Sequence, residues 1–140
     1  MRSKTADRWG VKELRAIPAF AACTDKELGL IDSTATRVDV APGHVLTSEG
    51  QIGRESFVVL EGAATVSIKG SEVAVAGTGE FIGEMALLDN QPRTATVTAL
   101  TAMHLLVFDS RSFSTALQST AFARRMLQGL SQRLRSVESA

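Results

Sequence analysis

Residues 79–99, GEFIGEMALLDNQPRTATVTA, contain a short helix-like run, GEMALL, between segments that resemble strands. A helix starting near Gly83 would leave several backbone N–H groups without partners inside the helix and would present the positive end of a small dipole. Such a terminus binds phosphate or carboxylate groups well, and a glycine lets a ligand approach the backbone closely. The stretch therefore indicates an anion-binding site in the middle of the chain.

Two opposite charges accompany this run, Glu84 and, nine residues later, Arg93, which precedes the apolar segment TATVTAL. The base of Arg93 should lie near the core. A partly buried guanidinium needs an anion, because leaving it unpaired costs on the order of several kcal/mol. Arg93 could pair with Glu84 in a structural salt bridge, or it could bind a phosphate bidentately. The residues alone favour the salt bridge and leave the phosphate as the alternative.

The flanking sequence, residues 35–108, predicts a β zone built from short runs rich in β-branched residues. Gly, Pro, Asp or Ser closes each run, and the spacing is typical of a sandwich or barrel. The predicted strands are TRVDV, HVLTSEG, SFVVLEG, ATVSIKG, EVAVAG, TATVTAL and MHLLVFD. A chain of 140 residues predicts a single domain over 1–140, with N-terminal helices in 1–34 and C-terminal helices in 109–138.

Helix signals lie on both sides of the β zone. Thr24 followed by Glu27 is a capping-box pattern that predicts a helix over 25–34, and a second short helix is expected over 11–16. After residue 109, apolar residues recur at spacings of three and four, with a break near 119–120 where Ser119 could cap a second helix. We expect this apolar stripe to pack on the β core; dimerisation, or closure over a ligand, is the alternative.

Composition excludes several classes of protein. Lys plus Arg equals Asp plus Glu at 15 each, which gives no global reason to expect a nucleic-acid partner. Cys23 is the only cysteine, so no disulfide or thiolate metal site can form within the chain, and we expect Cys23 to be a small buried residue. His44 and His104 are 60 residues apart, and no catalytic or metal-binding set is predicted. No signal peptide or membrane span is expected, which favours the cytoplasm.

The segment FIGEMALLDNQPRTATV resembles the phosphate-binding cassette of the cyclic nucleotide-binding domain family, in which Phe-Gly-Glu-(Leu/Met)-Ala-Leu precedes Pro-Arg-(Ala/Ser/Thr)-Ala-Thr-Val. IPAFAACTDKELGLI, APGHVLTSEGQIGRESFVVLEGAATV and VFDSRSFSTAL resemble the helices and glycine-punctuated strands of the same family. The resemblance implies a mainly β fold, an eight-stranded, jelly-roll-like β-roll flanked by helices. It also implies a 3′,5′-cyclic nucleotide as ligand, with no cofactor and no metal.

Carried over position by position, the resemblance implies that Arg93 pairs with the cyclic phosphate and that Glu84 accepts a hydrogen bond from the ribose 2′-hydroxyl. Gly83 would allow close approach near the ribose. The remaining implied contacts are the backbone N–H groups around Met85 and Ala86, which would cradle the phosphate, and the hydroxyl of Thr94, beside phosphate or base.

Two positions depart from the family pattern. Arg54 stands where the family often has an acid, and Ile82 stands where it has phenylalanine, but neither position contacts the phosphate. The segment SQRLRSVESA offers no aromatic residue to stack on a purine, which leaves a residue of the last helix such as Met126, Leu130 or Arg133 to cover the base. A hydroxyl at Thr94 can favour cGMP, yet bacterial cAMP receptors also tolerate one, so we expect cAMP first and cGMP next.

The sequence thus predicts a cyclic nucleotide sensor, not an enzyme, whose C-terminal helices rearrange when the ligand binds. The alternative is a protein-interaction module of the same fold that binds no ligand, with Glu84 and Arg93 as a structural ion pair. No helix-turn-helix or effector sequence follows the closing helices, so the effector is unknown. The C-terminal helix could form a homodimer. The arginines of this helical zone either lie on a solvated face or form a docking surface for an acidic partner.

Overall fold

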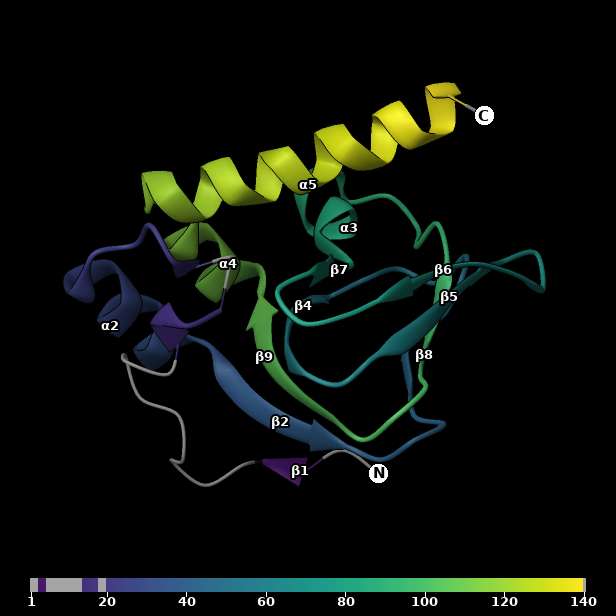
Figure 1. The fold of residues 1–140 in the computed structure, drawn as a ribbon, viewed down its shortest axis with the longest axis horizontal. Helices are drawn as coiled ribbons and strands as arrows, with labels where there is room; N and C mark the ends of the chain where they lie inside the picture. Colours follow the sequence, from purple (N-terminus) through teal and green to yellow (C-terminus); the bar gives the residue numbers. More distant parts are fainter. Residues whose placement is uncertain (1–2, 5–13, 18–19, 140) are drawn as a thin grey trace.

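The computed structural model describes residues 3–4, 14–17 and 20–139, and the side chains of residues 14–17 and 20–135. Residues 11–13 of the helix expected over 11–16 lie outside these residues. Within them the chain forms two antiparallel sheets with helices along one side (Figure 1). No helix in the described segments is long and apolar enough to cross a membrane.

The expected eight-stranded roll is confirmed and consists of β2 to β9. The strands are β2 (Thr36–Val40), β3 (Val45–Thr47), β4 (Glu55–Glu61), β5 (Ala64–Ile68), β6 (Ser71–Ala76), β7 (Phe81–Ile82), β8 (Thr96–Ala99) and β9 (Met103–Asp109). One sheet has the order β1-β2-β9-β4-β7 and the other has the order β3-β8-β5-β6. The additional strand β1 (Ser3–Lys4) pairs with β2 and has no counterpart in the sequence prediction.

Strands β4 and β9 are buried on both faces, and their alternating side chains supply two separate cores. Val58 and Leu106 belong to the core between the sheet and the helices, whereas Val59 and Leu105 belong to the core between the two sheets. Successive side chains of a strand point to opposite faces, so one apolar run can fill both layers. The central pair β4–β9 therefore ties the helices to the roll.

Helices α2 (Asp25–Thr34), α4 (Ser110–Ala116) and α5 (Thr120–Ser139) each begin at a side-chain cap. In α2, Thr24 and Glu27 form the predicted capping box. In α4, Asp109 accepts a hydrogen bond from the backbone N–H of Ser112 at 2.8 Å. The hydroxyl of Ser119 accepts from the backbone N–H of Phe122 at 3.2 Å at the start of α5, so the predicted break and cap are confirmed.

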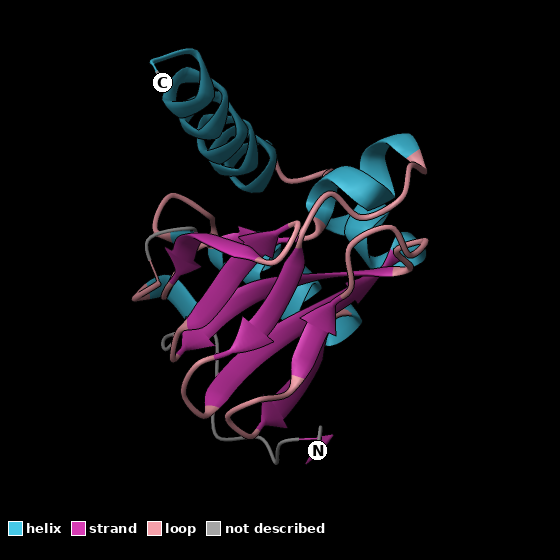
Figure 2. Cartoon of the chain, turned by 90° about the vertical axis from the view of Figure 1, so that its right-hand side faces the viewer, coloured by secondary structure: helices cyan, strands magenta, loops and turns pink. Residues whose placement is uncertain are grey.

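Phe122 anchors the first turn of α5 in the helix-side core. Its ring packs against Phe20, Phe81 and Phe108, with ring centroids 5.3–6.0 Å apart. Met126, one turn later, is also buried in this core. Beyond that turn the helix runs past α3 (Glu84–Asp89) toward β6 and stands away from the strands (Figures 1 and 2), and Leu127 is 59% exposed. The core thus holds only the first part of α5.

Replacing Phe122 with alanine should lower the free energy of unfolding by about 3–5 kcal/mol, because a fully buried aromatic ring is removed from among three others. Leu127→Ala, on the exposed side of the same helix, should change stability by less than about 0.5 kcal/mol. Urea denaturation of both variants measures the difference. Equal stabilities would contradict the anchoring role of Phe122.

Candidate functional site

The predicted cassette crosses from β7 to β8 through α3. Strand β7 pairs with β4, and Gly83 follows in the left-handed conformation, with φ of 77°, as the N-cap of α3. The helix ends at Asn90, which is also left-handed. The backbone N–H of Arg93 then donates to the carbonyl of Gln51 at 2.8 Å. A left-handed residue therefore lies at each end of the short helix. The hydrogen bond to Gln51 places Arg93 beside the turn that precedes β4.

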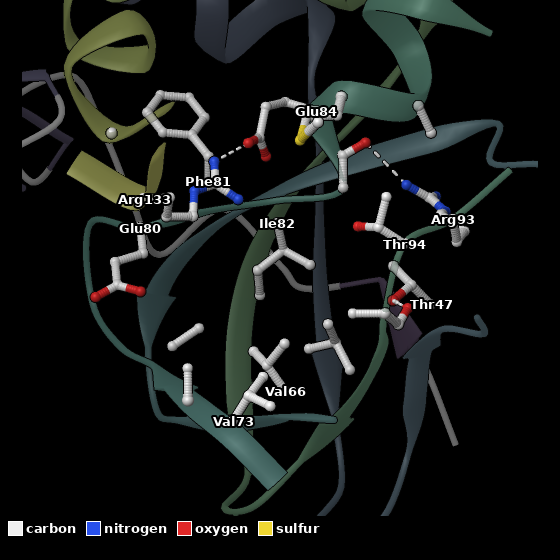
Figure 3. Close-up of a pocket in the computed structure, with 18 of the residues that line it drawn as sticks. Thr47, Val66, Val73, Glu80, Phe81, Ile82, Glu84, Arg93, Thr94 and Arg133 are labelled. Carbon is white, nitrogen blue, oxygen red and sulfur yellow. Dashed lines mark hydrogen bonds and ion pairs between the residues drawn. The ribbon is translucent and has the colours of Figure 1, made fainter. Parts of the chain in front are cut away.

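Arg93 is only 9% exposed, and its guanidinium is held by backbone carbonyls. It donates to the carbonyl of Gly83 at 2.8 Å (Figure 3) and to the carbonyl of Glu55. Burial lowers the pKa of the guanidinium, and the nearby carboxylates of Glu55 and Glu84 act in the opposite direction. Arginine nevertheless stays charged in proteins. The positive charge is thus oriented by carbonyls and remains able to bind an anion.

Two glycines leave room for this guanidinium. A Cβ at Gly53 would lie 2.4 Å from the Cζ and Nε of Arg93, and a Cβ at Gly83 would lie 2.2 Å from its Nη1. Neither position could carry a side chain unless the arginine moved. Gly53 was not among the predicted site residues, because in the sequence it is indistinguishable from the other turn glycines of the β zone.

Glu84 is fully buried, and its Oε1 accepts a hydrogen bond from Arg133 of α5 (Figure 3). Its other oxygen, Oε2, is buried without a hydrogen-bond partner among the described residues. The ion pair between Glu84 and Arg93 that the residues alone favoured does not form. Glu84 instead faces a cation from the last helix, and Arg93 has its carbonyl partners.

The six predicted site residues all line one cavity of about 820 Å³. These are Gly83, Glu84, Met85, Ala86, Arg93 and Thr94. Apolar residues of β5 and β6 form another part of its lining, and Figure 3 shows Val66 and Val73 on the side away from Glu84. Arg125, Gly129, Gln132 and Arg133 line it from α5. The cavity combines a charged end with an apolar side, which suits an amphipathic ligand.

Of the three residues considered as a cover for a base, only Arg133 lines the cavity. Met126 packs in the core with Phe20 and Phe122, and Leu130 is half-buried outside the lining. The helical spacing had placed Met126 and Leu130 on one apolar face. Arg133 is seven residues, about two turns, after Met126 and lies on the same side of α5, which meets the core at Met126 and the cavity farther along the helix.

Groups outside the cavity have structural partners. His104 is buried and its Nδ1 lies 2.7 Å from Asp39 on the neighbouring strand β2. Cys23 is buried, as expected, 3.9 Å from the hydroxyl of Ser119, and burial raises the pKa of its thiol. Within the described part of the chain, no three His, Cys, Asp or Glu residues are grouped as a metal site would require.

Comparison with known proteins assigns the family. The model of the cyclic nucleotide-binding domain matches residues 37–120, which include the whole roll from β3 to β9, the cassette and α4. The chain belongs to the cyclic nucleotide-binding domain family. The resemblance seen in the cassette is therefore confirmed over most of the described structure.

Similar curated proteins include a regulatory subunit of a protein kinase and a protein kinase. A cAMP-dependent protein kinase regulatory subunit from Mycosarcoma maydis is 32% identical over 87% of this chain and 24% of its own length. A cGMP-dependent protein kinase from Eimeria tenella is 36% identical over 61% of this chain and 9% of its own length. The chain thus spans a quarter or less of the length of these relatives.

Solved structures show the same fold. The N-terminal domain of a transcriptional regulator from Streptomyces coelicolor A3(2) is 34% identical, with a TM-score of 0.67 over 91% of this chain and 96% of that one. A cAMP-binding acyltransferase from Mycobacterium smegmatis is 28% identical, with a TM-score of 0.77 over 90% of this chain and 41% of that one. The domain is thus shared by proteins with unrelated effector activities.

Substituting alanine for Gly83 should destabilise the fold more than the same change at Gly70. Both glycines have similar positive φ values, 77° and 80°, and that conformation is less favourable for alanine by about 1–2 kcal/mol. Only at Gly83 does the new Cβ meet Arg93, which should add about 1–3 kcal/mol. Chemical denaturation of both variants tests this, and equal losses of stability would show that the guanidinium does not depend on the glycine.

Proposed function

We propose that this domain binds a 3′,5′-cyclic nucleotide in the cavity and acts as a regulatory sensor rather than as an enzyme. The observation that carries the proposal is the pair of opposite charges that line one cavity without pairing with each other. Arg93 is a buried cation held only by carbonyls, and Glu84 has a buried oxygen with no partner among the described residues. Buried polar groups are rarely left unpaired unless a ligand or water completes them.

A cyclic nucleotide supplies what both groups lack. Its cyclic phosphate is an anion that Arg93 can bind with two parallel hydrogen bonds, and backbone N–H groups at Met85 and Ala86 can add to them. Its ribose 2′-hydroxyl is a donor for Oε2 of Glu84. Gly83 lies between the two groups, where the absence of a side chain lets the sugar approach. These roles follow the family pattern, and the cavity brings all of the residues together.

Between the two common nucleotides, we favour cAMP over cGMP. The β5–β6 side of the cavity presents valine and alanine side chains, which suit adenine better than guanine, because guanine carries more polar edge groups that need partners. Thr94 is exposed and lines the cavity, and its hydroxyl could accept a hydrogen bond from the amino group of guanine. The relatives named above include a cAMP-dependent protein kinase regulatory subunit and a cGMP-dependent protein kinase, so they do not decide between the two.

Ligand binding should also change the position of α5. Glu84 is fully covered, and Arg133 is the partner that covers it from α5. A ribose hydroxyl reaches the carboxylate only if Arg133 shifts, and the second half of α5 has little core packing to resist such a shift. We infer that this movement is the signal. Exposed Leu127 and Leu134 on α5 are candidates for contact with an effector or with a second copy of the chain.

Arg93→Ala should weaken cAMP binding at least about thirtyfold, because it removes a buried, hydrogen-bonded cation from the phosphate. Calorimetric titration with cAMP and with cGMP measures this and ranks the two nucleotides. Arg111→Ala, which removes an exposed arginine of α4, is the control and should leave the affinity unchanged. Binding by Arg93→Ala as tight as that of the unmodified protein would rule out the proposed phosphate contact. If a folded, unmodified protein binds neither nucleotide, an interaction module without ligand becomes the better interpretation.

Arg133→Ala should tighten cAMP binding about fivefold, because the ligand no longer has to displace a partly exposed ion pair. Arg124→Ala removes the same charge from α5 at a position that does not line the cavity, and it should have no effect. The same titrations provide the measurement. Weaker binding by Arg133→Ala would mean that this arginine supports the bound ligand instead of covering its site.

A further inference from the structure

A second cavity lies between the start of α5 and the segment that leads into α2, and it takes no part in the proposed nucleotide site. Figure 1 shows both segments at the same end of the molecule. The cavity has a volume of about 530 Å³, within the range of roughly 300–1,000 Å³ that is usual for small-molecule sites. Among the described residues that line it, Arg125 alone also lines the first cavity. The two cavities are therefore distinct.

Helix α5 presents a polar stripe to this second cavity. The residues that line it from this stripe are Ala121, Arg124, Arg125 and Gln128. Their spacing of three, four and seven residues from Ala121 puts them on one side of the helix. Phe122 and Met126 of the same turns pack in the helix-side core instead. The two arginines therefore border the cavity and do not contribute to the core.

Neither of these arginines is neutralised within the described part of the chain. The ion pairs found there join Arg15, Arg37 and Arg133 to acids, and none of them includes Arg124 or Arg125. Arg124 is exposed and Arg125 is half-buried. A guanidinium that is partly withdrawn from water is stabilised by an anion. The α5 side of the cavity thus offers two cations that are available to a ligand.

The acid that lines the cavity, Glu27, is held by other groups. Its Oε2 accepts a hydrogen bond from the hydroxyl of Ser119, and its Oε1 accepts one from the backbone N–H of Thr24 at 2.8 Å. These hydrogen bonds lower the pKa of the Glu27 carboxyl, so it is ionised at neutral pH. Each carboxylate oxygen can still accept a further hydrogen bond. The cavity therefore joins a cationic side to an acceptor that suits a hydroxyl group.

The charges and the size of the cavity together indicate the class of ligand. Arg124 and Arg125 leave the helix about 100° apart, so one anion that binds both must offer acceptors in several directions. A phosphate group does this, and its oxygens match the fork of a guanidinium. A bare phosphate ion would leave much of the cavity unfilled, whereas a small phosphate ester with hydroxyl groups would also reach Glu27.

We propose that the second cavity binds a small phosphate monoester, with the phosphate on Arg124 and Arg125 and its hydroxyl groups at Glu27. This site does not depend on the proposed nucleotide site. Arg124 lines the second cavity and not the first, so its removal tests the second cavity separately.

The test is a titration of the ¹⁵N-labelled protein with glycerol 3-phosphate at constant ionic strength, followed by nuclear magnetic resonance. We expect saturable shifts of the amide signals of Ala22, Ala121 and Gln128. Glycerol, which lacks the phosphate, should leave these signals unchanged, and inorganic phosphate should bind more weakly than the ester. Arg124→Ala should weaken binding of the ester at least about tenfold, because it removes a charged hydrogen-bond donor. Arg111→Ala removes the same charge from α4 outside this cavity and should have no effect.

Several outcomes would overturn this inference. Shifts that do not saturate, or an affinity that Arg124→Ala leaves unchanged, would mean that the two arginines lie on a solvated face. Shifts confined to the amides of Gly83 and Ala86 would place the phosphate at Arg93 instead. Inorganic phosphate that binds as tightly as the ester would rule out the contact with Glu27. A failure of cAMP to bind would contradict the proposed function and leave this inference intact.

Discussion

The separation of two buried opposite charges, Arg93 and Glu84, is the constraint on which the site depends. A direct ion pair between them would satisfy both groups and leave nothing for a ligand to bind. The fold prevents it by giving each group another partner, carbonyls for Arg93 and the half-exposed Arg133 for Glu84. Both arrangements are incomplete: the partners of Arg93 are neutral carbonyls, and Oε2 of Glu84 lacks a hydrogen-bond partner among the described residues. Incomplete satisfaction of buried groups is what would give the cavity the affinity for a polar ligand that we propose.

The two cores hold the strands that support this site, and the helix-side core also holds the first part of α5, whose second half has little core packing. Strands β4 and β9 supply side chains to both cores, so the carbonyl of Glu55 that orients Arg93 belongs to the strand pair with the most burial. The same helix-side core holds Phe122 at the start of α5. Farther along, this helix contacts the cassette through Arg133. One chain segment thus combines an end packed in the core with a farther part that contacts the cassette through an ion pair.

Most of the architecture could be predicted from the sequence, because local chemistry fixes it. The capping boxes, the turn glycines and the alternating strands each have a signal within a few residues. Strand β7 could not be found this way, since two residues show no alternation, and β1 is equally short. The six site residues could be named from the cassette. The partner of Glu84 could not, because Arg133 is 49 residues away and reaches the acid only through the course taken by α5.

The orientation of α5 shows why helical periodicity alone gave an incomplete account of the site. Its apolar stripe predicted correctly that one face packs on the core, and Met126 lies there. The same side of the helix continues from the core to the cavity, because Arg133 is seven residues, about two helical turns, after Met126. Position along the helix therefore decides the role of each residue on that side: Met126, near the start of α5, packs in the core, and Arg133, farther along, lines the cavity. Periodicity predicts which residues share a face, but it does not predict where along the helix the core ends and the cavity begins.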